Sequence, residues 1–254
     1  MSVRTGISTV DTMVMMPQPK TAPKYAALQE SLGQHAGDPT VSPVAHLFRD
    51  MPTLPDGANP IDHTLAEMDR FDIEYAVVDL VHDPEASLAV EKHPDRFIPI
   101  TSTDPHSGMD GIRALEQAHR QYGVRGTSIS PAFLHPPVAI NDARMYPIYA
   151  KCVELDIAVF MTVGMPGPRV RMAPQNVELL DEVCWYFPEL KLVMRHGAEP
   201  WEELAVKLLL KWPNLYYSTS AFAPRRYPTC VVDYANRRGA EKVMFAGYYA
   251  VGLS

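Results

Sequence analysis

The sequence has no long apolar run, no excess of positive charge and very little cysteine. No apolar segment approaches the roughly 20 residues that a membrane-spanning helix requires, and the first ten residues lack the apolar core of a signal peptide. The net charge is −7, without any run of lysine or arginine, whereas nucleic-acid binding demands clustered cations. We therefore expect a cytoplasmic protein with no nucleic-acid and no membrane partner.

Several well-known site motifs are also missing. Cys152, Cys184 and Cys230 are scattered and odd in number, which suits three unpaired thiols in a reducing compartment. There is no HxH, no HExxH and no Cys/His cluster of the kind that holds zinc. The glycine-rich phosphate loop GxGxxG and the nucleophile motif GxSxG are absent as well.

Short apolar segments rich in Val, Ile and Phe alternate with longer segments of helical period. Nearly continuous apolar strands are typical of a parallel sheet that is covered on both faces, and eight such units predict an α/β fold, a (β/α)8 TIM barrel. A doubly wound open sheet is the alternative, although it usually carries a phosphate loop. The expected strands are 8–16, 75–81, 97–103, 124–130, 157–164, 190–197, 215–221 and 242–249. The expected helices are 61–73, 84–94, 108–123, 143–155, 176–187, 200–211 and 227–238.

The pattern predicts a single barrel domain over 1–254. Many of its 24 prolines lie in a proline-rich insertion at about 17–60, between the first strand and the first helix. The chain ends just past the eighth expected strand, without an eighth helix. Because an uncovered strand exposes apolar surface, we expect either a shortened chain or burial against another subunit, and hence a homo-oligomer.

In a barrel of this kind the active site lies at the carboxyl ends of the strands. His196 closes an apolar strand and precedes Gly197, so it could serve as a metal ligand, a base or a hydrogen-bonded wall of the pocket. Arg195 could bind a carboxylate in bidentate fashion. Strand alternation, however, predicts that Arg195 and His196 point to opposite sides, in which case Arg195 would pair with an acid on a neighbouring helix.

Four stretches carry a resemblance to a known family: KHPDRFIPITSTDPHSGMDGIRALEQA (92–118), MYPIYAKCVELDIAVFMTVG (145–164), LKLVMRHG (190–197) and KVMFAGYY (242–249). In order and spacing they resemble the amidohydrolase-related (amidohydrolase 2) family of TIM-barrel proteins. That family includes aminocarboxymuconate-semialdehyde decarboxylase and related hydrolases and decarboxylases. The resemblance runs from about residue 61 to the end of the chain, with a weaker match over 7–17.

The resemblance implies a set of metal ligands that this chain has mostly lost. Members of the family carry an HxH pair on strand one, a His on strand five, a His on strand six and an Asp on strand eight, which hold a divalent metal, usually zinc. These positions fall on Met13, Met15, Thr162, His196 and Tyr248, so only His196 is kept. Because a single imidazole cannot hold catalytic zinc, we expect no cofactor.

The resemblance also implies a hydrolase or a decarboxylase-like lyase that acts on a small carboxylate or cyclic substrate without the usual zinc site. His196 would be the acid or base, Tyr248 would donate to a developing oxyanion, and Thr162 would complete the catalytic set. The substrate-binding residues would be Arg195, Arg169, Ser218 and His106.

Two other hypotheses stay open. The chain could be a non-catalytic ligand-binding pseudoenzyme or a structural subunit of a larger complex. It could also hold an unusual metal site built from His196 with His82, His106 or Asp79.

Overall fold

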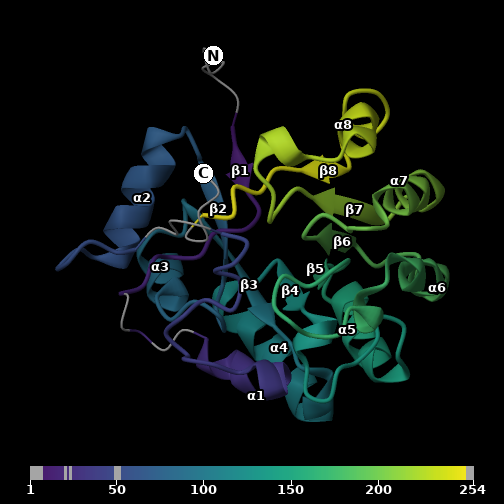
Figure 1. Cartoon of the computed structure of the whole chain (residues 1–254), viewed down its shortest axis with the longest axis horizontal. Helices are drawn as coiled ribbons and strands as arrows, with labels where there is room; N and C mark the ends of the chain where they lie inside the picture. Colours follow the sequence, from purple (N-terminus) through teal and green to yellow (C-terminus); the bar gives the residue numbers. More distant parts are fainter. Residues whose placement is uncertain (1–7, 20–21, 23–24, 49–52, 250–254) are drawn as a thin grey trace.

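The computed structural model describes residues 8–19, 22, 25–48 and 53–249. Over that part of the chain, eight parallel strands follow one another in sequence order, each paired with the next. They alternate with helices that ring the outside of the sheet (Figure 1). The strands are β1 (Val10–Asp11), β2 (Tyr75–Asp79), β3 (Phe97–Ser102), β4 (Gly126–Ile129), β5 (Ala158–Thr162), β6 (Leu192–Arg195), β7 (Leu215–Ser218) and β8 (Val243–Met244).

The helices match the predicted ones within a few residues at each end. Asn59 caps the first long helix by accepting the N–H groups of Ile61 and Asp62, and Gly123 ends the longest one with a φ of 65°. Among the described residues, no helix is both long enough and apolar enough to cross a membrane. The helices are α1 (Gln29–Leu32), α2 (Pro60–Arg70), α3 (Ala86–Lys92), α4 (Gly108–Tyr122), α5 (Tyr146–Glu154), α6 (Leu180–Tyr186), α7 (Glu202–Lys211) and α8 (Thr229–Ala235).

The last strand returns to the first, which confirms the predicted TIM-barrel fold. The N–H of Thr12 donates to the carbonyl of Phe245 at 3.1 Å, and a parallel bridge joins Val14 to Tyr249. The segment 250–254, on which the expectation of a shortened chain rested, lies outside the described residues.

Most of the apolar core lies between the barrel and its helices, as expected for strands that are covered on their outer face. Inside the barrel the buried apolar cluster is small and consists of Val77, Ile100, Phe160 and Val193, from four different strands. Polar side chains follow this cluster toward the carboxyl ends of the strands. The barrel interior is therefore apolar in its middle and polar toward the carboxyl ends of the strands.

The proline-rich segment between β1 and α2 packs against loops at the carboxyl ends of the strands. The Ser31 hydroxyl donates to the carbonyl of Phe133, just after β4. The Phe48 ring lies 6.0 Å from the Tyr248 ring, just after β8. A Cβ added at Gly167, in the loop after β5, would come within 2.8 Å of Val44. The described parts of this segment thus contact the end of the barrel that carries active sites in this fold.

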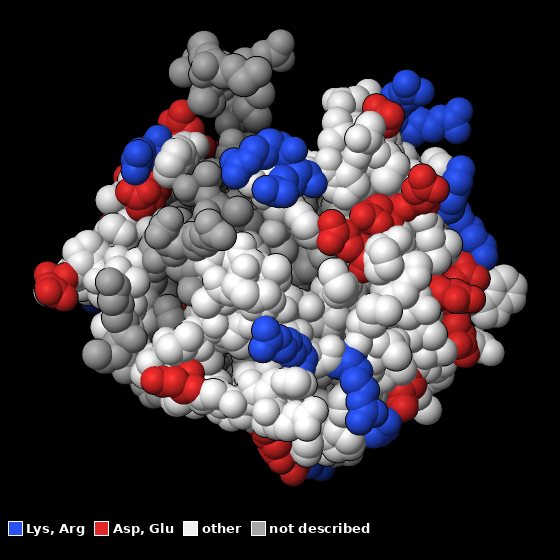
Figure 2. Space-filling view, in the orientation of Figure 1, with Lys and Arg blue, Asp and Glu red and all other residues white. Residues whose placement is uncertain are grey.

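Charged side chains are dispersed over the face seen in Figure 1. In Figure 2, lysine and arginine side chains stand in separate small groups with uncharged surface between them. The part of this face that the structure describes therefore has no continuous basic patch of the kind that nucleic acid binds.

The close approach of the β5 and β6 loops gives a first prediction. Gly164 has a φ of 81°, and a Cβ there would lie 2.8 Å from the backbone of Ala198 and Glu199. We expect Gly164→Ala to lower the free energy of unfolding by about 2–4 kcal/mol, because strain and a backbone clash add. Urea unfolding measures this loss.

The matched control is Gly37→Ala, because Gly37 has open space around its Cβ position. It should stay within about 0.5 kcal/mol of wild type. Equal stabilities for the two variants would contradict the close packing of these loops.

Candidate functional site

Polar side chains from all eight strands, or from the residues just after them, gather at the carboxyl end of the barrel. Among the described residues, five of the side-chain hydrogen bonds that join different strands involve residues near the mouth. Hydroxyl groups take part in all five, so the barrel mouth is lined by groups that can donate or accept. The pairs are Asp79 with Ser102 at 2.7 Å, Ser128 with Arg195 at 3.2 Å, Ser130 with Thr162 at 2.9 Å, Thr12 with Ser218 at 3.1 Å, and His196 with Ser220 at 3.2 Å.

Arg195 extends its side chain into the barrel. Its guanidinium carbon lies 4.4 Å from the centre of the Phe160 ring, which belongs to the interior apolar cluster. Its two terminal nitrogens donate to the Ser128 hydroxyl at 3.2 Å and to the carbonyl of Thr12 at 3.3 Å. Arg195 is only 4% exposed. It therefore places a positive charge in the barrel interior, next to the interior apolar cluster.

The charge of Arg195 has no direct counterion in the part of the chain that the structure describes. None of the salt bridges there includes it. Its buried Nε also has no hydrogen-bond partner among the described residues. Burial lowers the pKa of Arg195 to about 10, and attraction to Asp79 opposes this shift. Arg195 thus stays charged at neutral pH.

The backbone explains why Arg195 and His196 both reach the site. His196, Gly197 and Ala198 have φ values of 68°, 85° and 64°, all in the left-handed region. Such a run breaks the alternation of an extended strand. The prediction that the two side chains point to opposite sides was therefore wrong, and so was the pairing of Arg195 with an acid on a helix.

His196 is held by Ser220 and lies against Tyr248. The Ser220 hydroxyl accepts the backbone N–H of His196 at 3.0 Å and lies 3.2 Å from its Nδ1. The imidazole meets the Tyr248 ring edge to face, with 5.3 Å between ring centres. Since Nδ1 is engaged by Ser220, Nε2 is the ring atom left to meet a ligand.

Both rings keep their uncharged forms at neutral pH. Burial, and secondarily the charge of Arg195, lower the pKa of His196 to about 3. Burial raises the pKa of Tyr248 to about 12, although Arg195 opposes this shift. A neutral imidazole and a phenol can each donate a hydrogen bond without carrying charge.

Strained backbone accompanies these residues. Tyr248, after β8, has a φ of 56°, and Ala221, after β7, has a φ of 73°. Non-glycine residues in this region are uncommon and gather at functional sites. The ends of β6, β7 and β8 all carry this feature, which supports a functional role for this side of the mouth.

The remaining predicted residues divide into two groups. Thr162 and Ser218 are buried at the barrel mouth, where they bond to Ser130 and Thr12. His106 and Arg169 are exposed on loops, and Nε2 of His106 lies 2.8 Å from the carbonyl of Pro136. The structure therefore brings His196, Tyr248, Arg195, Thr162 and Ser218 to the barrel mouth and leaves His106 and Arg169 at the surface.

Sequence reasoning missed three residues that shape the site. Phe160 stacks under the guanidinium of Arg195, and the alternation of 158, 160 and 162 along β5 could have revealed that it faces inward. Asp11 and Asp83 are buried acids that accept backbone N–H groups around β1. No motif in the sequence marks either acid, because burial and long-range hydrogen bonds give them this role.

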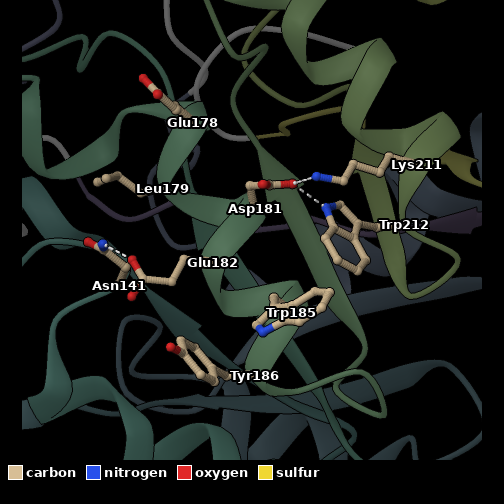
Figure 3. Close-up of a pocket in the computed structure, with 9 residues that line it drawn as sticks. All are labelled: Asn141, Glu178, Leu179, Asp181, Glu182, Trp185, Tyr186, Lys211 and Trp212. Carbon is tan, nitrogen blue, oxygen red and sulfur yellow. Dashed lines mark hydrogen bonds and ion pairs between the residues drawn. The ribbon is translucent and has the colours of Figure 1, made fainter.

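A groove on the outside of the barrel lies along α6 and α7 (Figure 3). Its polar groups are largely paired with one another: Asp181 accepts from Lys211 at 2.6 Å and from Trp212 at 2.7 Å, and Glu182 accepts from Asn141 at 2.6 Å. These contacts tie neighbouring helices together. The groove is therefore best explained as a packing feature of the outer layer.

Comparison with known proteins finds one sequence family and several similar TIM-barrel structures. A sequence model described as Amidohydrolase matches residues 28–250. An uncharacterised TIM-barrel protein from Bordetella bronchiseptica aligns with a TM-score of 0.69 at 22% identity, covering 97% of this chain and 88% of that one. No curated protein is significantly similar in sequence.

Two enzymes are among the similar solved structures. The 5-carboxyvanillate decarboxylase of Novosphingobium aromaticivorans, with bound manganese and 3-methoxy-4-hydroxy-5-nitrobenzoic acid, gives a TM-score of 0.68 at 14% identity, with 99% and 89% of the two chains covered. The 4-oxalomesaconate hydratase of Rhodopseudomonas palustris gives 0.53 at 18% identity, with 94% and 81% covered.

The expectation of no cofactor is corrected by these structures, because the similar decarboxylase binds manganese and so points to a metal cofactor in the family. The residues of this chain do not fit such an ion. Within the described ranges, no group of three or more His, Cys, Asp or Glu side chains could hold a metal. Met13 and Met15 offer soft thioethers where manganese prefers oxygen and imidazole ligands.

The buried acids give a prediction for pH dependence. Burial raises the pKa of Asp11 and of Asp83 to about 6 from 3.8. The folded state therefore holds these protons more tightly than the unfolded state, so the free energy of unfolding falls as pH rises from about 4 to 6. Above that window the destabilisation is complete. His196 has the opposite effect on the free energy of unfolding, which it raises as pH rises, because its pKa is lowered in the folded state.

The Asp11→Asn variant tests the contribution of Asp11 alone to this pH dependence. Oδ1 of Asp11 accepts both the Met13 and Gly247 N–H groups, and an amide oxygen can do the same. We expect the variant to be more stable than wild type at pH 7.5 by about 1–2 kcal/mol, and the difference to shrink at pH 4. Denaturant unfolding at both pH values tests this, with exposed Asp233→Asn as control. An equal difference at both pH values would refute the assignment.

Proposed function

Because this chain belongs to the amidohydrolase family, we propose that it is a lyase or hydrolase that acts on a small carboxylate or cyclic substrate at the carboxyl end of its barrel. The observation that carries the proposal is the convergence of His196, Tyr248 and Arg195, from the ends of two strands, on a mouth with strained backbone. The similar solved structures include a decarboxylase and a hydratase, which supports the same reaction classes here.

The proposed chemistry rests on two uncharged donors. Loss of CO2 from a β-keto acid, addition of water to a double bond conjugated with a carbonyl, and attack of water on an ester all move negative charge onto a carbonyl oxygen of the substrate. Nε2 of His196 and the hydroxyl of Tyr248 would donate hydrogen bonds to that oxygen. In the tautomer that this chemistry requires, the Ser220 hydroxyl donates to Nδ1 and the imidazole proton lies on Nε2. The low pKa of His196 favours this neutral donor over an imidazolium.

A second candidate function is a ligand-binding protein without catalysis. The observation that favours it is the lack of a metal-binding group of His, Cys, Asp or Glu among the described residues. The sequence resemblance agrees, because it assigns four of the family's five metal-ligand positions to Met13, Met15, Thr162 and Tyr248. The same end of the barrel would then bind a small carboxylate without turning it over.

Turnover assays separate the two functions. The panel contains 5-carboxyvanillate, 4-oxalomesaconate, lactones, amides and β-keto acids, each assayed with added Mn²⁺ and with a chelator. Turnover of any of them in either condition supports an enzyme. Binding without turnover across the panel supports the non-catalytic alternative.

His196→Asn tests the catalytic role. Asparagine tolerates a φ of 68° better than most residues, so the backbone should be kept. We expect kcat to fall by about 10²–10⁴-fold, with thermal unfolding close to wild type. The control is His35→Asn, because His35 is exposed on a surface turn. Wild-type kcat in His196→Asn would rule out this role.

A further inference from the structure

The guanidinium of Arg195 is a buried cation with donors to spare. Of its five N–H groups, two are used, by Ser128 and by Thr12, and Nε is buried without a partner among the described residues. Leaving a buried charge unpaired strongly destabilises the folded state. Phe160 on one side supplies only a ring face. Among the described residues, the guanidinium therefore has the free donors of an anion site but no anion.

The missing partner is best supplied by a carboxylate. Guanidinium groups match carboxylates in shape, since two parallel N–H groups meet two oxygens. Asp79 attracts Arg195 electrostatically but already accepts from Ser102 at 2.7 Å and from the Val81 N–H at 2.9 Å. The polar groups that Arg195 contacts directly are the Ser128 hydroxyl and the Thr12 carbonyl, and neither carries a charge that would neutralise the guanidinium.

We propose that Arg195 anchors a substrate carboxylate that is retained in the product, so that the substrate carries a second reactive group facing His196 and Tyr248. The reaction of the second group rests on the proposed function, whereas the binding of the carboxylate by Arg195 does not.

The chemistry explains why the anchored carboxylate would be retained. When a carboxylate leaves as CO2, the electron pair of its carbon–carbon bond passes to the remaining carbon, and the carboxylate loses its charge. A cation held against that carboxylate stabilises the starting state more than the transition state, and so slows the step. A group that reacts elsewhere on the molecule gains from the same anchor through positioning. The substrate class is therefore a carboxylate with a second carboxyl, lactone, ester or enol group.

Binding of an inert pair of probes tests the anchor without any turnover. Benzoate and benzamide share shape and differ in charge. We expect calorimetry to show benzoate binding to the wild-type protein, and binding about tenfold or more weaker in Arg195→Met. The exposed control Arg238→Met should bind benzoate like wild type, and benzamide should bind poorly to all three proteins.

Thermal unfolding of Arg195→Met guards against loss of the fold. Because methionine replaces an unpaired buried charge, we expect a melting temperature at or above that of wild type. No benzoate binding by wild type, equal benzoate affinity in folded Arg195→Met, or equal affinity for benzamide would overturn the anchor. Turnover of a compound that loses its only carboxylate would contradict the proposal that the carboxylate bound by Arg195 is retained in the product. Benzoate binding with no turnover of any panel compound would instead count against the proposed function alone.

Discussion

The buried positive charge of Arg195 is the constraint on which the mouth of this barrel depends. A guanidinium inside an α/β barrel needs acceptors and a surface that tolerates charge. Here Ser128, the Thr12 carbonyl and the face of Phe160 supply them from three different strands. Arg195 lies between two parts of the barrel interior. One is a small apolar cluster, and the other, at the carboxyl ends of the strands, consists of hydroxyl groups that form hydrogen bonds between strands. The same charge helps to lower the pKa of His196, so it also sets the form in which the imidazole meets a ligand.

Geometry at this end depends on backbone conformations that ordinary strands do not adopt. Three successive left-handed residues end β6 and turn His196 to the same side as Arg195. The chain tolerates this path because glycines stand where a side chain would collide: a Cβ at Gly197 would come within 2.2 Å of the Phe222 ring. Conformational strain of this kind persists only where packing over-determines it. The close contact between the β5 and β6 loops provides that packing, and it links the stability of the fold to the position of the imidazole.

The fold was predictable because strand and helix periods differ, and both are clear along most of this chain. Helix starts such as Asn59 before Pro60 carry their own signals. The site was only partly predictable. The position of His196 and Tyr248 at the barrel mouth followed from the order of the strands, because the carboxyl ends of barrel strands are the expected place for chemistry. The direction of Arg195 was not, because only Gly197 hints at the left-handed run and His196 and Ala198 give no sign of it. The exposed positions of His106 and Arg169 could not be predicted, because the path of the chain after a strand decides whether its residues reach the mouth.

The relation to manganese-binding structures of the same fold sharpens what this chain has kept. The sequence resemblance assigns four metal-ligand positions of the family to Met13, Met15, Thr162 and Tyr248, and the structure places a fixed cation and two neutral donors at the carboxyl end of the barrel. A charge built into the chain differs from a bound ion in one respect: it is present whatever the metal content of the surroundings, and it must be desolvated once, during folding. Its cost is therefore borne by the stability of the protein and not by each binding event. Such preorganisation lets a modest ligand charge produce a specific orientation. That is the physical reason to place the substrate carboxylate at Arg195 and the reacting atoms at His196.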